Sequence, residues 1–325
     1  MVVGHAAWFV HGHFPYDWGF AGETLSLVYI TVAVALAVIV RIASKRWSAG
    51  RDIPFLARLV PWMPFVVRIH ISVALIMLAS FGRYLTPAMH LHQTVAGYLL
   101  GALELVVAIL FAAGWHTRPA ALLLVASGPI GMLEFGFFPV LLGVHLLGGA
   151  MFVLFTGPGR WSADWELGNR IEFSFDQAAR AIWCFRVSTG LALVFAAFDE
   201  KLARPNISVV FLHLYPRFNV LADIGLPIGS LEYTRLAGGM EILLALLLIS
   251  GALPQIITPV AAFPFIATLT LLGTFELGGH LPDHAALIAF IVFASDPKLR
   301  ATVYMLWPWR WPRPRISRQS TQPTM

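Results

Sequence analysis

Apolar segments alternate with short polar segments along almost the whole chain. A helix of about 20 apolar residues crosses the hydrocarbon core of a bilayer, so this pattern predicts nine membrane-spanning helices. The fourth and fifth are short for a crossing, and Pro139, Pro259 and Pro264 can break or reposition a helix. The predicted spans cover residues 24–41, 66–82, 94–113, 119–137, 140–156, 181–199, 231–251, 256–275 and 284–305.

Each half of the chain places one carboxylate near the middle of an apolar span. Glu104 lies between Gly101 and Gly114, and Glu241 lies at the same spacing between Gly238 and Gly251. A shared pattern of this length indicates an internal duplication, which sets the architecture before any site is considered. The register continues through four further matches, which pair Arg68 with Arg186, Arg83 with Lys201, Glu134-Phe135-Gly136 with Glu276-Leu277-Gly278, and His145 with His284.

Basic residues gather in residues 41–68, residues 157–186 and the tail from Trp307 to Arg318. Cytoplasmic loops carry an excess of Lys and Arg, so we expect these segments inside and the N-terminus outside. Four spans per repeat is an even number, so the two repeats share one orientation. The expected protein is all-α and multi-pass, in a bacterial-type cytoplasmic (inner) membrane with its C-terminus in the cytoplasm.

Composition narrows the class of protein. Hydrophobic residues make up 58% of the 325 residues and charged residues only 12%, whereas soluble domains carry about 25% charged residues. The net charge of +5 belongs to the loops and the tail, so it does not indicate nucleic-acid binding. A single cysteine, Cys184, excludes disulfide exchange within the chain. Residues 1–22 lack the basic start of a cleavable signal peptide.

The segment that ends the first repeat, Gly157 to Asp164 (GPGRWSAD), resembles the ending of DoxX-family membrane proteins. Arg68 at the start of a span, the G-x-x-E of Gly101 to Glu104 and the turn LFAAGWHTRPAALLL agree with that resemblance. It implies one four-helix unit over residues 66–164 and a second over 181–300, in which ASDPKLR replaces the ending. The resemblance covers about two-thirds of the chain.

Three segments lie outside the two DoxX-like units. Residues 1–65 hold the N-terminal external segment, the first span and a basic loop, 165–180 form a cytoplasmic linker, and 301–325 hold the end of the last span and the basic tail. That tail combines Trp and Arg, which suits an interface beside anionic lipid. The DoxX family is similar to the membrane subunit of thiosulfate:quinone oxidoreductase and to small quinone-linked or redox-stress membrane proteins.

Glu104 and Glu241 are the first candidates for chemistry, because a charged group at mid-bilayer costs about 2.5–3.5 kcal/mol. Each could accept protons at a quinone or transport site. Alternatively, each is a structural partner of a buried arginine, Arg68 or Arg186, beside close-packed glycines. The structural interpretation is the favoured one, although a duplicated scaffold suits both.

A second group of polar residues is expected near the outer ends of the helices. In each repeat, a Glu before Gly would meet a His at the head of the next span across a tight turn. Such pairs can relay protons, hydrogen-bond a quinone carbonyl or bind a metal, but capping and solvation also explain polar residues there. The group comprises Glu134, His145, Glu276, His280, Asp283 and His284.

The remaining polar sequences carry weaker signals. The H-x-H pairs at 11/13 and 90/92 could catch copper or zinc, but solvated loops are the simpler interpretation, and we expect no metal site. Asp199-Glu200-Lys201 indicates local charge compensation, or a partner surface. No P-loop, dinucleotide fingerprint, nucleophile elbow or C-x-x-C-H is present, so a cofactor enzyme would carry its cofactor on another chain.

The resulting hypothesis is a membrane component of a quinone-linked redox system, with quinone or a small substrate between the repeats and a soluble or membrane redox partner. Glu104 and Glu241 would be buried proton or hydrogen-bond groups, with His145 and His284 as polar contacts. Arg68, Arg186, Glu134, Glu276 and His280 would contact the quinone. The alternatives are a non-catalytic scaffold for partner proteins and a small-molecule or ion carrier.

Overall fold

The computed structural model describes residues 6–10, 12–46, 50–170 and 172–309. Within these ranges the chain is almost entirely helical, and its strands form one short antiparallel hairpin of β1 (Arg83–Tyr84) and β2 (Thr86–His90). His11 of the first H-x-H pair, and the tail beyond Trp309, lie outside the described residues.

The long helices are separated by short turns or by short helical segments. The main helices are α2 (Thr24–Ser44), α4 (Met63–Ser80), α5 (Val95–Ala113), α6 (Thr117–Phe135), α8 (Val144–Thr156), α10 (Phe175–Ala197), α13 (Ser230–Ser250), α14 (Pro254–Leu272) and α15 (Phe275–Ser295). The shorter helices are α1 (Trp18–Gly22), α3 (Pro54–Ala57), α7 (Phe137–Leu142), α9 (Ala163–Glu166), α11 (Pro205–Leu214), α12 (Val220–Asp223) and α16 (Arg300–Tyr304). Four irregular turns complete the chain, namely η1 (Ala6–Trp8), η2 (Val60–Trp62), the π turn η3 (Phe198–Leu202) and η4 (Pro216–Phe218).

Seven helices of the described chain are long and apolar enough to cross a membrane. This indicates a multi-pass membrane protein, and the seven helices coincide with seven of the nine predicted spans. The other two predicted spans correspond to α6 and to the α7–α8 segment, which Gly143 divides. The 13 residues of α8 extend about 20 Å at 1.5 Å per residue, which is short of a 30 Å hydrocarbon core.

The last long helix differs from its prediction. We expected a span at 284–305, with GGHLPDH at 278–284 as a turn before it, but α15 runs from Phe275 to Ser295 and contains that whole segment. Pro282 lies inside the helix, as prolines can in membrane helices when neighbouring groups satisfy the freed carbonyl. His280, Asp283 and His284 therefore lie within a helix and not at its head.

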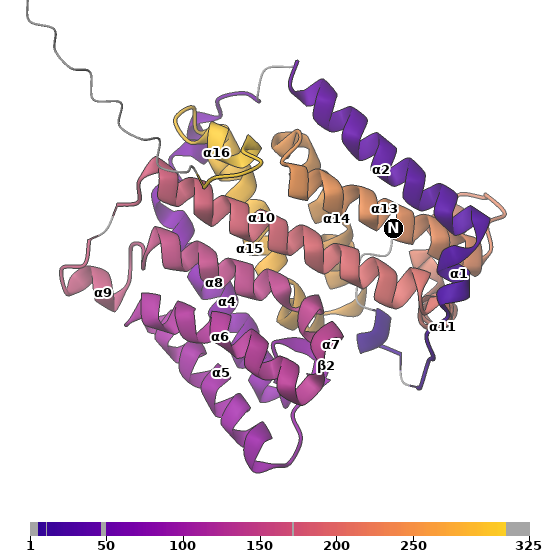
Figure 1. The fold of residues 1–325 in the computed structure, drawn as a ribbon, viewed down its shortest axis with the longest axis horizontal. Helices are drawn as coiled ribbons and strands as arrows, with labels where there is room; N and C mark the ends of the chain where they lie inside the picture. The colour runs from indigo at the N-terminus through magenta and orange to yellow at the C-terminus, as the bar shows by residue number, and fades with distance from the viewer. Residues whose placement is uncertain (1–5, 11, 47–49, 171, 310–325) are drawn as a thin grey trace, which may run out of the picture.

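Helices of the first half pack directly against helices of the second half (Figure 1). In the first half, α4 packs on α5 and α8; in the second half, α10 packs on α13 and α15. Between the halves, α10 lies along α8 and α15 lies along α4, so one continuous apolar core runs through both.

The helices have two ends that differ in composition. We call the end with the β1–β2 turn and residues 198–229 the hairpin end, and the end with residues 157–174 and 296–309 the linker end. Residues from both halves meet at each end, and the chemistry of the two ends is described separately below.

The first long helix, α2, packs on α13 on the outside of the second half (Figure 1). Polar contacts hold it at both ends. Arg235 on α13 donates to Ser26 Oγ over 3.1 Å and pairs with Glu23, and Arg41 donates to the carbonyl of Tyr304 over 2.8 Å. Most of the remaining surface of α2 is exposed in the isolated chain, as expected of a helix that faces lipid.

Candidate functional site

At the linker end, two buried arginines hold helix ends together. Arg68 on α4 donates to the carbonyls of Ala112 and Trp161, each over 2.8 Å, and also to that of Phe111. Arg186 on α10 donates to Met305 over 2.9 Å and also to Val303. The predicted pairing of Arg68 with Glu104 and of Arg186 with Glu241 is therefore wrong, because both guanidinium groups are occupied by main-chain carbonyls at the linker end.

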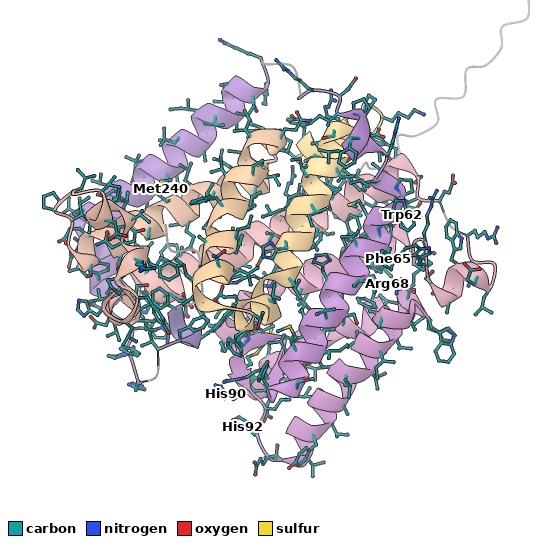
Figure 2. The ribbon with its side chains drawn as sticks, turned by 180° about the vertical axis from the view of Figure 1, so that it is seen from behind. Trp62, Phe65, Arg68, His90, His92 and Met240 are labelled. Carbon is teal, nitrogen blue, oxygen red and sulfur yellow. The ribbon has the colours of Figure 1, made fainter. Side chains whose placement is uncertain are left out.

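The GPGRWSAD segment gives this end its shape. Gly159 has φ of +72°, and a Cβ there would lie 2.8 Å from the main-chain nitrogen of Phe65. The rings of Trp62 and Phe65 contact Trp161 with centroids 5.0 and 5.4 Å away, and Figure 2 shows Trp62, just before α4, followed by Phe65 and Arg68 on α4. Asp164 accepts hydrogen bonds from the amides of His116 and Thr117, each over 2.9 Å, and so caps α6. The segment therefore fixes the ends of α4 and α6 at the linker end.

Glu104 is buried midway along α5, at 2% exposure. One carboxylate oxygen accepts a hydrogen bond from the amide of Leu85 over 3.1 Å. The other oxygen has no hydrogen-bond partner among the described residues. Leu85 is held at φ of +54° in the turn between β1 and β2, so Glu104 fastens an unusual backbone conformation of the hairpin.

Glu241 is buried to the same extent but meets a cation. Its carboxylate lies 2.9 Å from Nζ of Lys201, and the two side chains are 2% and 1% exposed. A second carboxylate, that of Glu200, lies 4.0 Å from the same ammonium group. Buried ions are tolerated when they are paired in this way.

The π turn η3 directs three consecutive charged side chains to different partners. Asp199 accepts a hydrogen bond from Tyr16 over 2.7 Å and pairs with Arg204. Glu200 accepts from the amide of Ala6 over 2.8 Å, and Lys201 reaches Glu241. All three are at most 3% exposed. Turns of this type are rare and occur frequently at functional sites.

A second buried pair lies on α15. His280 Nδ1 is 2.8 Å from Glu276, one helical turn away, with side-chain exposures of 3% and 1%. Asp283 and Glu200 also act electrostatically on His280, which links this pair to the charges of η3. The ring of Trp8 covers His280 at 5.0 Å between centroids, and a Cβ on Gly279 would lie 1.8 Å from that indole.

The predicted meeting of a glutamate and a histidine across a tight turn does not occur in either half. Glu134 ends α6 and contacts His92 over 2.9 Å, whereas His145 is buried near the start of α8. Glu276 and His284 lie on the same helix, and His284 contacts the ring of Phe265 at 5.9 Å. Glu134 and Glu276 also occupy different places, the end of α6 and the start of α15, so their predicted equivalence is wrong.

A polar cleft of about 310 Å³ opens at the hairpin end, between the two halves. The first half contributes the hairpin and α7, the second half contributes η3, α11 and Phe275, and the segment from Trp8 to Tyr16 covers one side. The charged and imidazole groups in its wall are Arg83, His90, Asp199, Glu200 and Arg204.

Some charged groups of this cleft have an oppositely charged partner in the described chain and others do not. Asp199 pairs with Arg204, while Arg83 donates to the ring of His90 and meets no carboxylate among the described residues. Partial burial and the Arg83 guanidinium lower the pKa of His90. Burial and the bond to Asp199 raise the pKa of Tyr16 to about 12, so its hydroxyl stays a donor at neutral pH.

None of the nine predicted site residues lines this cleft, although Glu200 connects it to Glu241 and His280. Sequence reasoning missed Glu200 because Asp199-Glu200-Lys201 was interpreted as surface charge compensation. A signal was available, since these three charges follow directly on a 23-residue helix and Lys201 matches Arg83 in the proposed repeat.

Comparisons with protein-family models, with curated proteins and with solved structures found no match. The chemistry of the site must therefore be argued from its own residues. Among the described residues no group of three or more His, Cys, Asp or Glu side chains is arranged to hold a metal ion. What the arrangement offers is a polar cleft joined to a buried chain of acids and bases, which suits binding of a small polar group and movement of protons.

Proposed function

We propose that the protein is a membrane component of a quinone-linked redox system, and that the cleft at the hairpin end binds the polar head of a quinone or a small substrate. The observation that carries this proposal is Glu200. It lines the cleft and lies 4.0 Å from Lys201, which pairs with Glu241. His280 adjoins the same cleft through Trp8, whose ring lies 5.0 Å from the imidazole and lines the cleft.

The chemistry required is modest. Reduction of a quinone to a quinol takes up two electrons and two protons. The electrons would come from a reduced small substrate or from a partner protein, and the protons would pass through acids and bases beside the quinone. General acid–base groups of this kind contribute about 10²–10⁴-fold to a rate. Arg83 would donate hydrogen bonds to a quinone oxygen, and the Tyr16 hydroxyl, whose proton is held by Asp199, would line the cleft beside it.

We further propose that the chain contains two DoxX-like four-helix units that face each other about a pseudo-twofold axis. Two features support this. Gly114 and Gly251 end α5 and α13 at φ of +64° and +66°, each beside the buried arginine of its half. The helix pairs that join the halves, α4 with α15 and α10 with α8, exchange under such an axis.

The proposed orientation places the hairpin end outside the cytoplasm. The linker end carries the basic segments, which positive-inside statistics assign to the cytoplasm. The cleft would then exchange protons with the outer side of a bacterial-type inner membrane. Cysteine accessibility tests this orientation, with Trp161→Cys at the linker end and Val95→Cys at the hairpin end, both in a Cys184→Ala background. A reagent that does not cross the membrane should label Val95→Cys in intact cells and leave Trp161→Cys unlabelled.

The function is tested by quinone bound to the purified protein and by quinone reduction in membranes. We expect Glu200→Gln and Glu241→Gln to lower reduction about 100-fold, in line with loss of a proton-transfer group. The control Glu232→Gln removes an exposed carboxylate at the same end and should retain the wild-type rate. Equal reduction and equal bound quinone in all four proteins would reject the role.

A further inference from the structure

A second cleft, of about 310 Å³, lies at the linker end and takes no part in the proposed redox site. It is formed where η2 and α4 begin, where the GPGRWSAD segment turns and where α15 ends. Its apolar wall includes Pro61, Pro64 and Phe173, and its charged groups are Arg160, Glu172, Asp296 and Lys298.

Two cations without ion-pair partners among the described residues lie at the rim of this linker-end cleft, where they can contact an anion. The carboxylate of Asp296 is turned to the main chain, because its Oδ1 accepts from the amides of Lys298 and Leu299 over 2.7 and 3.1 Å. Neither Arg160 nor Lys298 forms an ion pair with any described residue, and both side chains are exposed at the rim. Arg160 is held in place by the ring of Trp62, 5.3 Å from its guanidinium carbon. Glu172 is the one remaining acid in the wall.

The surroundings favour a lipid over a soluble anion. The cleft lies beside the ends of candidate membrane spans, and Trp161 next to it is 69% exposed, which is typical of a tryptophan at the headgroup level. Trp62 at the end of η2 and Phe65 in the first turn of α4 lie at the same end of the molecule (Figure 2). An apolar wall with two cations at its rim matches a molecule that joins a phosphate to hydrocarbon.

We infer that this linker-end cleft binds the headgroup of an acidic phospholipid, with Arg160 and Lys298 contacting its phosphate. The site is separate from the redox cleft and does not depend on the function proposed there. Lysine or arginine near an anionic membrane surface contributes about 1 kcal/mol, so loss of one cation should weaken binding about five-fold and loss of both about 25-fold.

The test is native mass spectrometry of the full chain in neutral detergent, titrated with phosphatidylglycerol or phosphatidylcholine. We expect the wild type to prefer phosphatidylglycerol, Lys298→Gln to lose about five-fold of that affinity, and the Arg160→Gln/Lys298→Gln pair about 25-fold. Glu172→Gln should strengthen binding, because it removes the acid beside the cations. The control Arg58→Gln removes an exposed cation at the same end, outside the cleft, and should keep the wild-type affinity for phosphatidylglycerol.

Lys298→Gln keeps the proposal testable if the Arg160 variant folds poorly, since the structure gives the Lys298 side chain no packing or pairing role. Phosphatidylglycerol binding that is unchanged in the paired variant, or reduced equally by Arg58→Gln, would overturn the inference. Displacement of the lipid by an equal concentration of glycerol phosphate would also overturn it, because the site would then recognise a free phosphate ester.

Discussion

The two halves of the molecule each bury a glutamate midway along an apolar helix, but they compensate the carboxylate differently. Glu104 receives one hydrogen bond from a main-chain amide, whereas Glu241 lies against an ammonium group with a second carboxylate nearby. Arg83, the residue that the proposed repeat matches with Lys201, turns instead to the cleft. The first glutamate therefore fastens a hairpin, and the second belongs to a charge network.

The largest difference is expected between the two single variants in which one of these glutamates is replaced by glutamine. Glu241→Gln leaves the buried Lys201 without its closest anion, which should lower the free energy of unfolding by roughly 3–5 kcal/mol. Glu104→Gln keeps an acceptor for the amide of Leu85 and should cost below about 1 kcal/mol. Denaturant titration in mild detergent measures both.

A matched control removes the charge pair as a whole. Lys201→Met combined with Glu241→Leu should recover most of the loss, because well-packed apolar residues often replace a buried ion pair without cost. If Glu104→Gln and Glu241→Gln lost the same free energy of unfolding, the pairing of Glu241 with Lys201 would not distinguish the two buried glutamates.

The two buried arginines, Arg68 beside Gly114 and Arg186 beside Gly251, should make the two halves equally sensitive to an added side chain. At Gly251, an added Cβ would lie 1.9 Å from Nη1 of Arg186. At Gly114, it would lie 2.3 Å from Cβ of Ser162 and 2.8 Å from Arg68. Gly→Ala at either place should cost roughly 2–4 kcal/mol, through overpacking and the positive φ. Thermal unfolding of the two variants gives the values. A loss at one position only would argue against the proposed equivalence of the halves.

The smallest effect concerns two tyrosines at the hairpin end. Burial raises the pKa of Tyr84 to about 12, and Tyr16 reaches about 12 through burial and Asp199. A phenol whose pKa is raised by folding stabilises the fold fully below its unfolded pKa near 10 and loses that contribution as the pH rises through 12. Absorbance titration of wild type, Tyr16→Phe and Tyr84→Phe should show one late phenolate fewer in each variant. A variant with as many late transitions as the wild type would contradict the assignment.

Much of the helical frame could be predicted from the sequence, because helix length, hydropathy and the glycines that end helices are local properties. Seven predicted spans coincide with long apolar helices, and Gly114 and Gly251 do end α5 and α13. The prediction failed for the GGHLPDH segment, where Gly, Pro and Asp indicated a turn. There, packing inside the bundle keeps Pro282 within α15.

The candidate site was harder to predict because it depends on contacts between distant segments. Glu200 accepts from Ala6 and Tyr16 donates to Asp199, across separations of more than 180 residues. The packing of the N-terminal segment on the second half leaves no periodic pattern in the sequence. The roles of Arg68 and Arg186 were missed for a related reason, since their partners are main-chain carbonyls, which every residue carries.

The wide turn at Phe198–Leu202 has a consequence for how this chain tolerates changes in length. It directs three adjacent charges to three different sets of partners: Asp199 to Tyr16, Glu200 to the amide of Ala6, and Lys201 to Glu241. Deleting one residue there would tighten the turn and rotate at least one of those charges toward hydrocarbon. This single coil must therefore keep its residue count.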